Sequence, residues 1–294
     1  MRTLAILTVS LGLVVAQRIS AQTQVLSDQV SVSAKPVLDA AGPRQRAAIK
    51  AVYLIACLKD NNAGTGFLLS NGLLVTNQHV VGNCDAGELL VVASSDKRVQ
   101  ITRRIVDKDR DLALLKPSER LDGGLELAKK GDPVPGTTVS TWGYPFLYNG
   151  FYPLLSVGYV AGYRNVQTSN QIVKHIVVNG AFNHGNSGGP LLVAQDNKVV
   201  GIVVATYHFF PEYVAQLIDA MQKQKSGFYN GAFITDASGR RISLSDAQVV
   251  GITLKEFYDK SQVMIGEAIA ASELAHFISE KQKELGLPIE AAKP

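Results

Sequence analysis

The 294-residue sequence lacks the features that mark nucleic-acid-binding or membrane-spanning proteins. Its formal net charge is only +4, and charged residues make up 18% of the chain without a long run of one sign. A balance this mild does not favour nucleic acid as a partner. The apolar run at residues 4–16 has 13 residues, too few to cross a bilayer comfortably. What remains is a globular composition, 46% hydrophobic, with enough chain for a sizeable core.

The first 21 residues have the architecture of a secretory signal peptide. Arg2 supplies a positive start, the apolar run follows, and small residues come next. Cleavage after Ala21 or after Ala16 fits the pattern. The alternative is a buried N-terminal helix. A signal peptide predicts a secreted protein, periplasmic or extracellular, whose mature form does not contact a membrane.

Cysteine is scarce, with only Cys57 and Cys84 in the chain. An even count in an exported protein favours one disulfide between them. The alternative is a pair of buried free thiols. A disulfide here closes a loop of nearly thirty residues and stabilises the fold by roughly 3–4 kcal/mol in the chain-entropy model.

Short β-rich runs dominate the sequence from residue 51 to residue 206. Turn signals separate them, and Asn71-Gly72 is a strong hairpin signal. Runs without intervening helices predict an all-β barrel or sandwich. The two β-rich halves, about 50–125 and 130–206, predict two packed barrels with a cleft between them. The expected strands are 52–55, 65–69, 73–76, 89–93, 99–106, 112–115, 137–141, 154–163, 172–178, 191–194 and 199–206.

Helical patterns are expected only after the strands. Residues 211–227 have apolar side chains at helical spacing, and a turn at residues 237–239 suggests a hairpin. The last helix is expected from Ser272, as N-cap, to about Glu284. Residues 22–46 are polar and contain Pro36 and Pro43, so a flexible lead-in is expected, with order beginning near Ala47.

A serine among three glycines, Gly185-Asn186-Ser187-Gly188-Gly189-Pro190, is the most informative stretch of the chain. Glycines let a backbone turn through positive φ and approach a ligand closely. The serine can attack a carbonyl, while the amides of Gly185 and Ser187 bind the oxygen that becomes negative. The alternative is an ordinary Gly-rich turn between strands.

A serine nucleophile needs a histidine base and a carboxylate that orients the histidine. His79 follows a predicted hairpin strand, and Asp111 opens the strand at 112–115. His79 could instead be structural, and the neighbouring Asp107 and Asp109 are expected to be solvated loop charges. The chain order histidine, aspartate, serine is that of the chymotrypsin fold.

Three blocks, Thr76–Val81, Asp111–Leu115 and Gly185–Pro190, resemble the catalytic blocks of trypsin-like serine peptidases, closest to the HtrA/Deg type. The resemblance implies a peptidase domain over about 47–286, built from two six-stranded antiparallel β-barrels, about 50–125 and 130–275. It also implies a catalytic triad of His79, Asp111 and Ser187 that hydrolyses protein or peptide substrates through an acyl-enzyme. No metal or organic cofactor is expected.

Two departures from the family alter the expectations for activation and specificity. Digestive relatives have an aspartate before the serine, which pairs with a new N-terminus, whereas this chain has Asn186. Activation through a freed N-terminus is therefore not expected. The specificity pocket contains no acid, which predicts a preference for small or medium aliphatic side chains. Its expected residues are Ala181, Phe182, Val204 and Thr206.

An insertion of about 57 residues, 207–263, separates the last two strands of the expected second barrel. The sequence ends shortly after the final helix, with 287–294 as a tail, so no PDZ domain is expected after the peptidase. We expect the insertion to form a lid or docking surface with aromatic anchors. The alternative is a packed decoration away from the substrate groove. The proposed anchors are Tyr207, Phe209, Phe210 and Tyr213.

Two other functions compete with the peptidase. An α/β-hydrolase esterase also has a G-x-S-x-G motif, but it needs a helix directly after the serine, where Pro190 and a β-rich run stand. A protein-binding or chaperone-like module could keep the triad and seldom cut. An oligomer is possible, although the sequence contains no trimer signature.

Overall fold

The computed structural model of the chain describes residues 34–129, 131–145, 152–206, 212–224, 227–228, 232–235, 240–260 and 265–286. The chain divides into two compact units. One is built from Ser31–Tyr207 and Val263–Pro294, and the other contains His208–Gln262. The expected signal peptide at 1–21 and the tail at 287–294 lie outside the described residues. Within the described residues, no helix has both the length and the apolar character needed to span a membrane.

The first half of the larger unit is a six-stranded antiparallel sheet in the order β4-β1-β2-β3-β6-β5. Its strands are β1 (Val52–Cys57), β2 (Asn62–Leu68), β3 (Leu74–Thr76), β4 (Leu89–Ala93), β5 (Ile101–Asp107) and β6 (Leu112–Pro117). The turn between β2 and β3 contains Gly72, whose φ of 86° suits glycine. Every residue of β1 is buried, so this strand runs through the middle of the core.

This first sheet does not close by direct pairing of its edge strands, as a fully closed barrel would. The residues just before β5 contact β4 instead. Val99 donates its amide hydrogen to the carbonyl of Val91 over 2.9 Å, and Val92 forms a β-bridge with Arg98. The strand expected to start at residue 99 begins at Ile101, because residues 98 and 99 are used in this contact.

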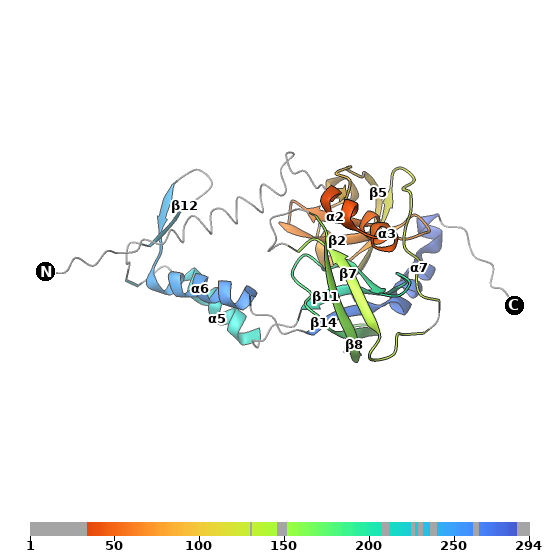
Figure 1. Cartoon of the computed structure of the whole chain (residues 1–294). Helices are drawn as coiled ribbons and strands as arrows, with labels where there is room; N and C mark the ends of the chain where they lie inside the picture. The colour runs from red at the N-terminus through yellow and green to blue at the C-terminus, as the bar shows by residue number, and fades with distance from the viewer. Residues whose placement is uncertain are drawn as a thin grey trace. The chain divides into compact units, whose positions relative to one another are not determined.

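The second half is a closed six-stranded barrel in the order β10-β11-β14-β9-β8-β7. Its strands are β7 (Thr138–Gly143), β8 (Leu154–Gln167), β9 (Ile172–Asn179), β10 (Pro190–Val193), β11 (Val199–Thr206) and β14 (Ile265–Ala270). Figure 1 shows β7 and β8 side by side, and their antiparallel ladder runs from Thr138 to Gly143. The expected all-β architecture of two β-structured halves is confirmed, with this half as the closed barrel.

The N-terminal segment differs from the expected flexible lead-in. Helices α2 (Lys35–Ala40) and α3 (Pro43–Ala51) precede β1, so regular structure begins before residue 47. Pro36 and Pro43 lie in the first turns of these helices, where a missing amide hydrogen breaks no helical hydrogen bond. The prolines therefore start helices here, although proline can equally mark a loop.

Three further helices accompany the sheets in the described residues. Helix α4 (Gln78–Val81) directly follows β3, and the 3-10 helix η1 (Ala86–Glu88) precedes β4. Helix α7 (Ala271–Leu285) directly follows β14. The expected cap at Ser272 is wrong, because the chain passes from β14 into the helix at Ala270, which makes no side-chain capping bond. Leu274, Phe277 and Ile278 are buried as expected.

The described residues of the smaller unit form two helices and a short hairpin. Helix α5 (Glu212–Lys223) occupies most of the span expected to be helical, and β12 (Phe233–Thr235) pairs with β13 (Arg241–Ser243). Helix α6 (Asp246–Lys260) was not expected from the sequence. Figure 1 shows α5 and α6 side by side, and the backbone of Gly251 packs closely against Gln222. The proposed aromatic anchors at 207, 209 and 210 lie outside the described residues.

The expected disulfide between Cys57 and Cys84 is present, with Cα atoms 5.6 Å apart. It joins the end of β1 to the segment after α4. Cys84 also donates its amide hydrogen to the carbonyl of Val81 over 3.2 Å. The disulfide therefore ties the segment that follows α4 to the end of β1.

Candidate active site

His79 and Asp111 meet through two separate contacts. His79 is the second residue of α4, and its ring nitrogen Nδ1 lies 2.8 Å from Asp111 Oδ2. The other carboxylate oxygen, Oδ1, accepts the backbone amide hydrogen of His79 over 2.9 Å. The backbone carbonyl of Asp111 also accepts the amide hydrogen of Gln78 over 3.1 Å. These bonds fix the imidazole relative to the carboxylate.

Asp111 occupies a turn with a φ of 53°, which is uncommon for a residue other than glycine. The side-chain amide of Asn77 donates to its carbonyl over 2.9 Å, so the turn is bonded to the residue before α4. An ionised carboxylate only accepts hydrogen bonds, so this contact suits the tautomer with the ring proton on Nδ1. The side chains of His79 and Asp111 are 49% and 27% exposed. In the tautomer with the proton on Nδ1, Nε2 is the ring nitrogen left to act as a base.

The serine loop, residues 185–189, turns sharply before Ser187. Asn186 donates its amide hydrogen to Asn183 O over 2.9 Å, and Gly185 within this turn has a φ of 99°. Gly188 has a φ of 84°. A Cβ atom on Gly188 would lie 2.1 Å from Thr65 O and 3.1 Å from the amide nitrogen of Asn77. Glycine is required there because the loop presses against the strand end that leads to His79.

The hydroxyl of Ser187 donates to the carbonyl of Val204 in β11 over 3.3 Å, a long hydrogen bond. Because this hydroxyl points at Val204 O, the Ser187 side chain must rotate before its proton can pass to Nε2 of His79. Catalytic hydrogen bonds in structures without substrate are often long or poorly aligned.

The four residues expected at the specificity pocket differ in their surroundings. Phe182 is only 1% exposed and belongs to the core of the closed barrel. A Cβ atom on Gly266 would lie 2.3 Å from the ring of Phe182, so the ring packs directly on β14. Ala181 and Val204 are half-buried. Thr206 pairs through its backbone with Gly266, and its side chain lies outside the described residues.

Arg110 is a functional candidate that the sequence pattern did not reveal. It is 8% exposed and immediately precedes Asp111. Its guanidinium donates to Asp107 over 2.6 Å and to Glu280 over 3.1 and 3.0 Å, and its Nε donates to Glu273 over 3.3 Å. The cluster of charges at residues 107–111 was the only signal, because Glu273 and Glu280 lie on α7, more than 160 residues away in sequence.

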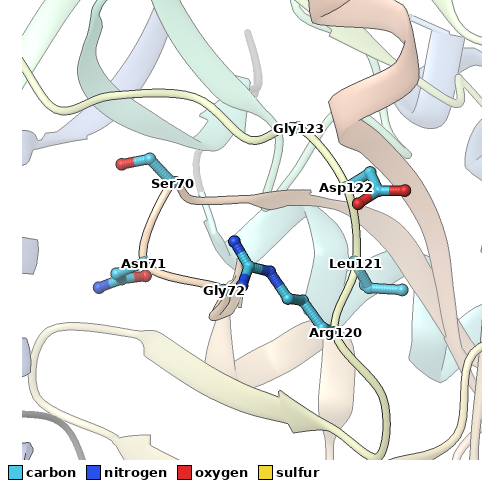
Figure 2. A pocket seen from close by; sticks show the side chains of 7 residues that line it. All are labelled: Ser70, Asn71, Gly72, Arg120, Leu121, Asp122 and Gly123. Atoms are coloured by element: carbon cyan, nitrogen blue, oxygen red, sulfur yellow. The ribbon is translucent and has the colours of Figure 1, made fainter.

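A cavity of about 340 Å³ lies at the turn between β2 and β3. Figure 2 shows the Arg120 side chain extending toward this turn. The lining is formed by Ser70, Asn71, Gly72, Arg120, Leu121, Asp122 and Gly123. It includes no residue expected to take part in catalysis or to shape the specificity pocket.

Comparison with known families places this geometry in context. Residues 64–202 match the family described as the trypsin-like peptidase domain. The match spans His79, Asp111 and Ser187. Over this region the chain is similar to trypsin-like peptidase domains. The predicted resemblance to this family is thereby confirmed, and the match begins in β2 and ends within β11.

Proteins similar to the chain include named serine proteases of the HtrA and DegP kind. The chain is 35% identical over 149 residues to "Serine protease HTRA4" from Mus musculus, covering 48% of this chain and 29% of that protein. It is also 35% identical over 147 residues to "Probable periplasmic serine endoprotease DegP-like" from Marinomonas sp. (strain MWYL1), covering 48% and 29%. The chain thus spans less than a third of the length of these relatives.

Solved structures resemble the peptidase domain in fold. The Rv3671c protease from M. tuberculosis in its active form has a TM-score of 0.55 and 19% identity, covering 90% of each chain. The inactive form of the Rv3671c protease has a TM-score of 0.54 and 18% identity, covering 85% of this chain and 97% of that one. At this identity the likeness concerns the fold alone.

Proposed function

We propose that this protein is a serine endopeptidase that cleaves protein substrates through an acyl-enzyme. Ser187 Oγ attacks the scissile carbonyl carbon, and its proton passes to Nε2 of His79. The resulting oxyanion is bound by the backbone amides of Gly185 and Ser187. His79 then protonates the leaving amine, and the C–N bond breaks. A water molecule, deprotonated by His79, hydrolyses the ester and regenerates the serine.

The observation that carries this proposal is the double contact between His79 and Asp111. One carboxylate oxygen accepts the ring Nδ1–H over 2.8 Å, and the other accepts the backbone amide hydrogen of His79 over 2.9 Å. A structural histidine needs a partner for its ring, but it does not need a carboxylate that also fixes its backbone. The trypsin-like family match and the serine proteases among the relatives add support.

We also propose a preference for small or medium aliphatic side chains before the cleaved bond. Phe182 carries this part of the proposal. Its ring packs on Gly266 of β14. Gly266 pairs with Thr206 of β11, which lies two residues beyond Val204. Val204 in turn accepts the hydroxyl hydrogen of Ser187 over 3.3 Å. We propose that this buried ring closes the base of the pocket and limits its depth. Replacement of Phe182 by alanine should extend cleavage to larger side chains in a peptide library.

The 207–263 insertion is proposed to act as a lid or docking surface for substrates. It leaves the peptidase domain at the end of β11, two residues beyond Val204. Deletion of residues 208–262 should change the cleavage-site profile of the protein. An unchanged profile would show that the insertion is a decoration remote from the substrate groove.

The site of action is proposed to be outside the cytoplasm, periplasmic or extracellular. Relatives are named as periplasmic endoproteases, and the N-terminal sequence has signal-peptide architecture. Fractionation of cells that express the full chain would detect the protein in the exported fraction. Protein retained in the cytoplasm would contradict this proposal.

A fluorophosphonate probe tests the enzymatic function directly. Such a probe reacts covalently with an activated serine, so the wild-type protein should be labelled and Ser187→Ala should not. Cleavage of a denatured protein substrate should be lost in the same variant. Ser156→Ala is a control, because this serine lies on β8 outside the proposed site. A folded wild-type protein that is not labelled would favour the alternative, a protein-binding module on the same fold.

A further inference from the structure

Thr65 occupies an unusual position in the first sheet. It lies in β2 opposite Leu54 of β1, and it is completely buried. On its other side, β3 pairs with β2 only at Phe67 and Leu68. The backbone of Thr65 therefore extends past the paired part of β3, and its amide hydrogen is available to another part of the molecule.

The polar atoms of Thr65 connect the first sheet to the serine loop. Its amide nitrogen donates to the carbonyl of Ser187 over 2.8 Å. Its hydroxyl donates to the carbonyl of Gly185 over 2.6 Å, and the same oxygen accepts the amide hydrogen of Tyr144 over 2.9 Å. Its carbonyl accepts the hydroxyl hydrogen of Thr76 over 2.7 Å. Each hydrogen-bonding group of Thr65 thus has a partner.

The direction of the hydroxyl bond follows from its partners. A backbone carbonyl only accepts and a backbone amide only donates, so the single hydroxyl proton points at Gly185 O. The carbonyl of Gly185 and the amide of Asn186 belong to the same planar peptide unit. Asn186 N donates to Asn183 O over 2.9 Å. This peptide unit is therefore held at both ends and cannot rotate freely.

The peptide unit held by Thr65 lies between the two proposed oxyanion donors. The amide of Gly185 precedes this unit and the amide of Ser187 follows it. The bond from Thr65 N to Ser187 O fixes the peptide unit between Ser187 and Gly188, which lies on the far side of the Ser187 amide. Two anchors from one residue therefore bracket the serine loop from the opposite half of the domain.

We propose that Thr65 is a positioning residue, which orients the amides of Gly185 and Ser187 toward the reacting carbonyl through its hydroxyl. The inference rests on the proposed peptidase function. Thr65 is completely buried, so it acts through the serine loop. Its role is to limit the rotation of the serine loop, so that the oxyanion donors need not be reorganised during each reaction.

Two replacements separate the hydroxyl from the rest of the side chain. Thr65→Val keeps the shape and removes the hydroxyl, whereas Thr65→Ser keeps the hydroxyl and removes the methyl group. Loss of a whole oxyanion donor costs about 10²–10³ in kcat, so loosened donors should cost on the order of 10- to 100-fold. We expect this loss in kcat for Thr65→Val, with KM changed little, and near wild-type kcat for Thr65→Ser.

A peptide aldehyde inhibitor distinguishes positioning from structural support. It forms a tetrahedral adduct with the serine, whose oxygen occupies the oxyanion site. Its inhibition constant should rise in Thr65→Val in proportion to the fall in kcat/KM. Thr168→Val is the matched control, because it removes a part-buried hydroxyl that bonds to Gln171 O in the turn between β8 and β9, away from the serine loop. It should lower the unfolding temperature and leave the inhibition constant within a few-fold of wild type.

Three results would overturn the inference. One is wild-type kcat and aldehyde affinity in Thr65→Val with only a lower unfolding temperature. Another is equal damage in Thr65→Ser and Thr65→Val, which would implicate the methyl group. If Thr65→Val does not fold, Thr65→Ala is labelled in the cold with the fluorophosphonate probe, and a native labelling rate overturns the proposal. A wild-type protein that neither cleaves nor reacts is a different outcome, because it removes the peptidase function and the inference with it.

Discussion

The two halves of the proposed active site are held in different ways. The acid–base half, His79 and Asp111, is joined by bonds within the first sheet, between a short helix and a turn 32 residues apart. The nucleophile half, residues 185–189, is bonded to Thr65, which is about 120 residues away on the other side of the domain. The acid–base pair is thus built locally, whereas the serine loop depends on contact between the two β-structured halves.

This difference separates two kinds of mutational damage. A change within the first sheet can alter the imidazole and leave the serine loop in place. A change at the seam between the halves alters the loop and leaves the imidazole bonded to Asp111. Substitutions on either side of this contact test the separation.

Asp111→Asn should break the acid–base half with the largest effect. Loss of the charge removes the preference for a proton on Nδ1 of His79, and triads of this type then lose roughly 10⁴-fold in kcat. Steady-state kinetics on a peptide substrate measure the loss. Asp109→Asn is the matched control from the same turn, because this carboxylate bonds to Asn170 over 2.5 Å and not to the histidine. A kcat within tenfold of wild type in Asp111→Asn would contradict the assigned role.

Arg110→Met tests whether the acid–base half is as local as the comparison implies. The change leaves Asp107 and Glu273, each 14% exposed, without their buried cation. Removal of one partner of a buried ion pair costs on the order of 3 kcal/mol of folding free energy. Urea denaturation should show this loss, and kcat should fall if α7 supports the Asp111 turn.

The control for Arg110 is Lys97→Met, which removes an exposed ion pair with Glu119. Exposed pairs contribute about 0–1 kcal/mol, so stability should hardly change. Equal stability losses in Lys97→Met and Arg110→Met would show that burial of the Arg110 cluster contributes little. An unchanged kcat in Arg110→Met would show that the turn keeps Asp111 in place without α7.

Replacement of Cys57 and Cys84 by serine should weaken the first sheet without touching the serine loop. The disulfide closes a loop with a sequence separation of 27, for which chain entropy predicts a loss of roughly 3–4 kcal/mol. Denaturation with and without reductant measures it in the wild-type protein as well. Below the denaturation midpoint, kcat should stay near the wild-type value. A large fall in kcat at unchanged stability would mean that the disulfide acts on α4 directly.

Tyr53 gives the smallest expected effect, and its test uses the pH dependence of folding stability. Burial raises the pKa of Tyr53 to about 12, and the same effect raises the pKa of Tyr144. The unfolded chain ionises its tyrosines near pH 10, so stability is full below that pH and is lost as pH rises toward 12, by at most about 1.4 kcal/mol per pKa unit. Tyr53→Phe should reduce this alkaline loss, as measured by urea denaturation across the range. Tyr159→Phe, an exposed tyrosine, should leave it unchanged.

Local pattern was enough for much of the fold. The strands 89–93 and 199–206 have the bounds expected from their β-rich runs, because alternation and turn residues act over a few positions. Proline was ambiguous, since Pro36 and Pro43 could either interrupt a loop or start a helix. Helix α6 was missed. It contains Gly251, whose lack of a side chain lets α6 pack closely against Gln222 of α5.

Residue types, their order along the chain and the turns they occupy are local features, so they predicted the chemistry of the candidate site. The contacts that hold these residues in place come from distant parts of the chain and became visible only in the fold. Thr65 bonds to Gly185, and Arg110 bonds to Glu273 and Glu280, across 120 to 170 positions. A hydrogen bond depends on distance and direction in space, and no local periodicity records which distant carbonyl or carboxylate the folded chain brings within reach.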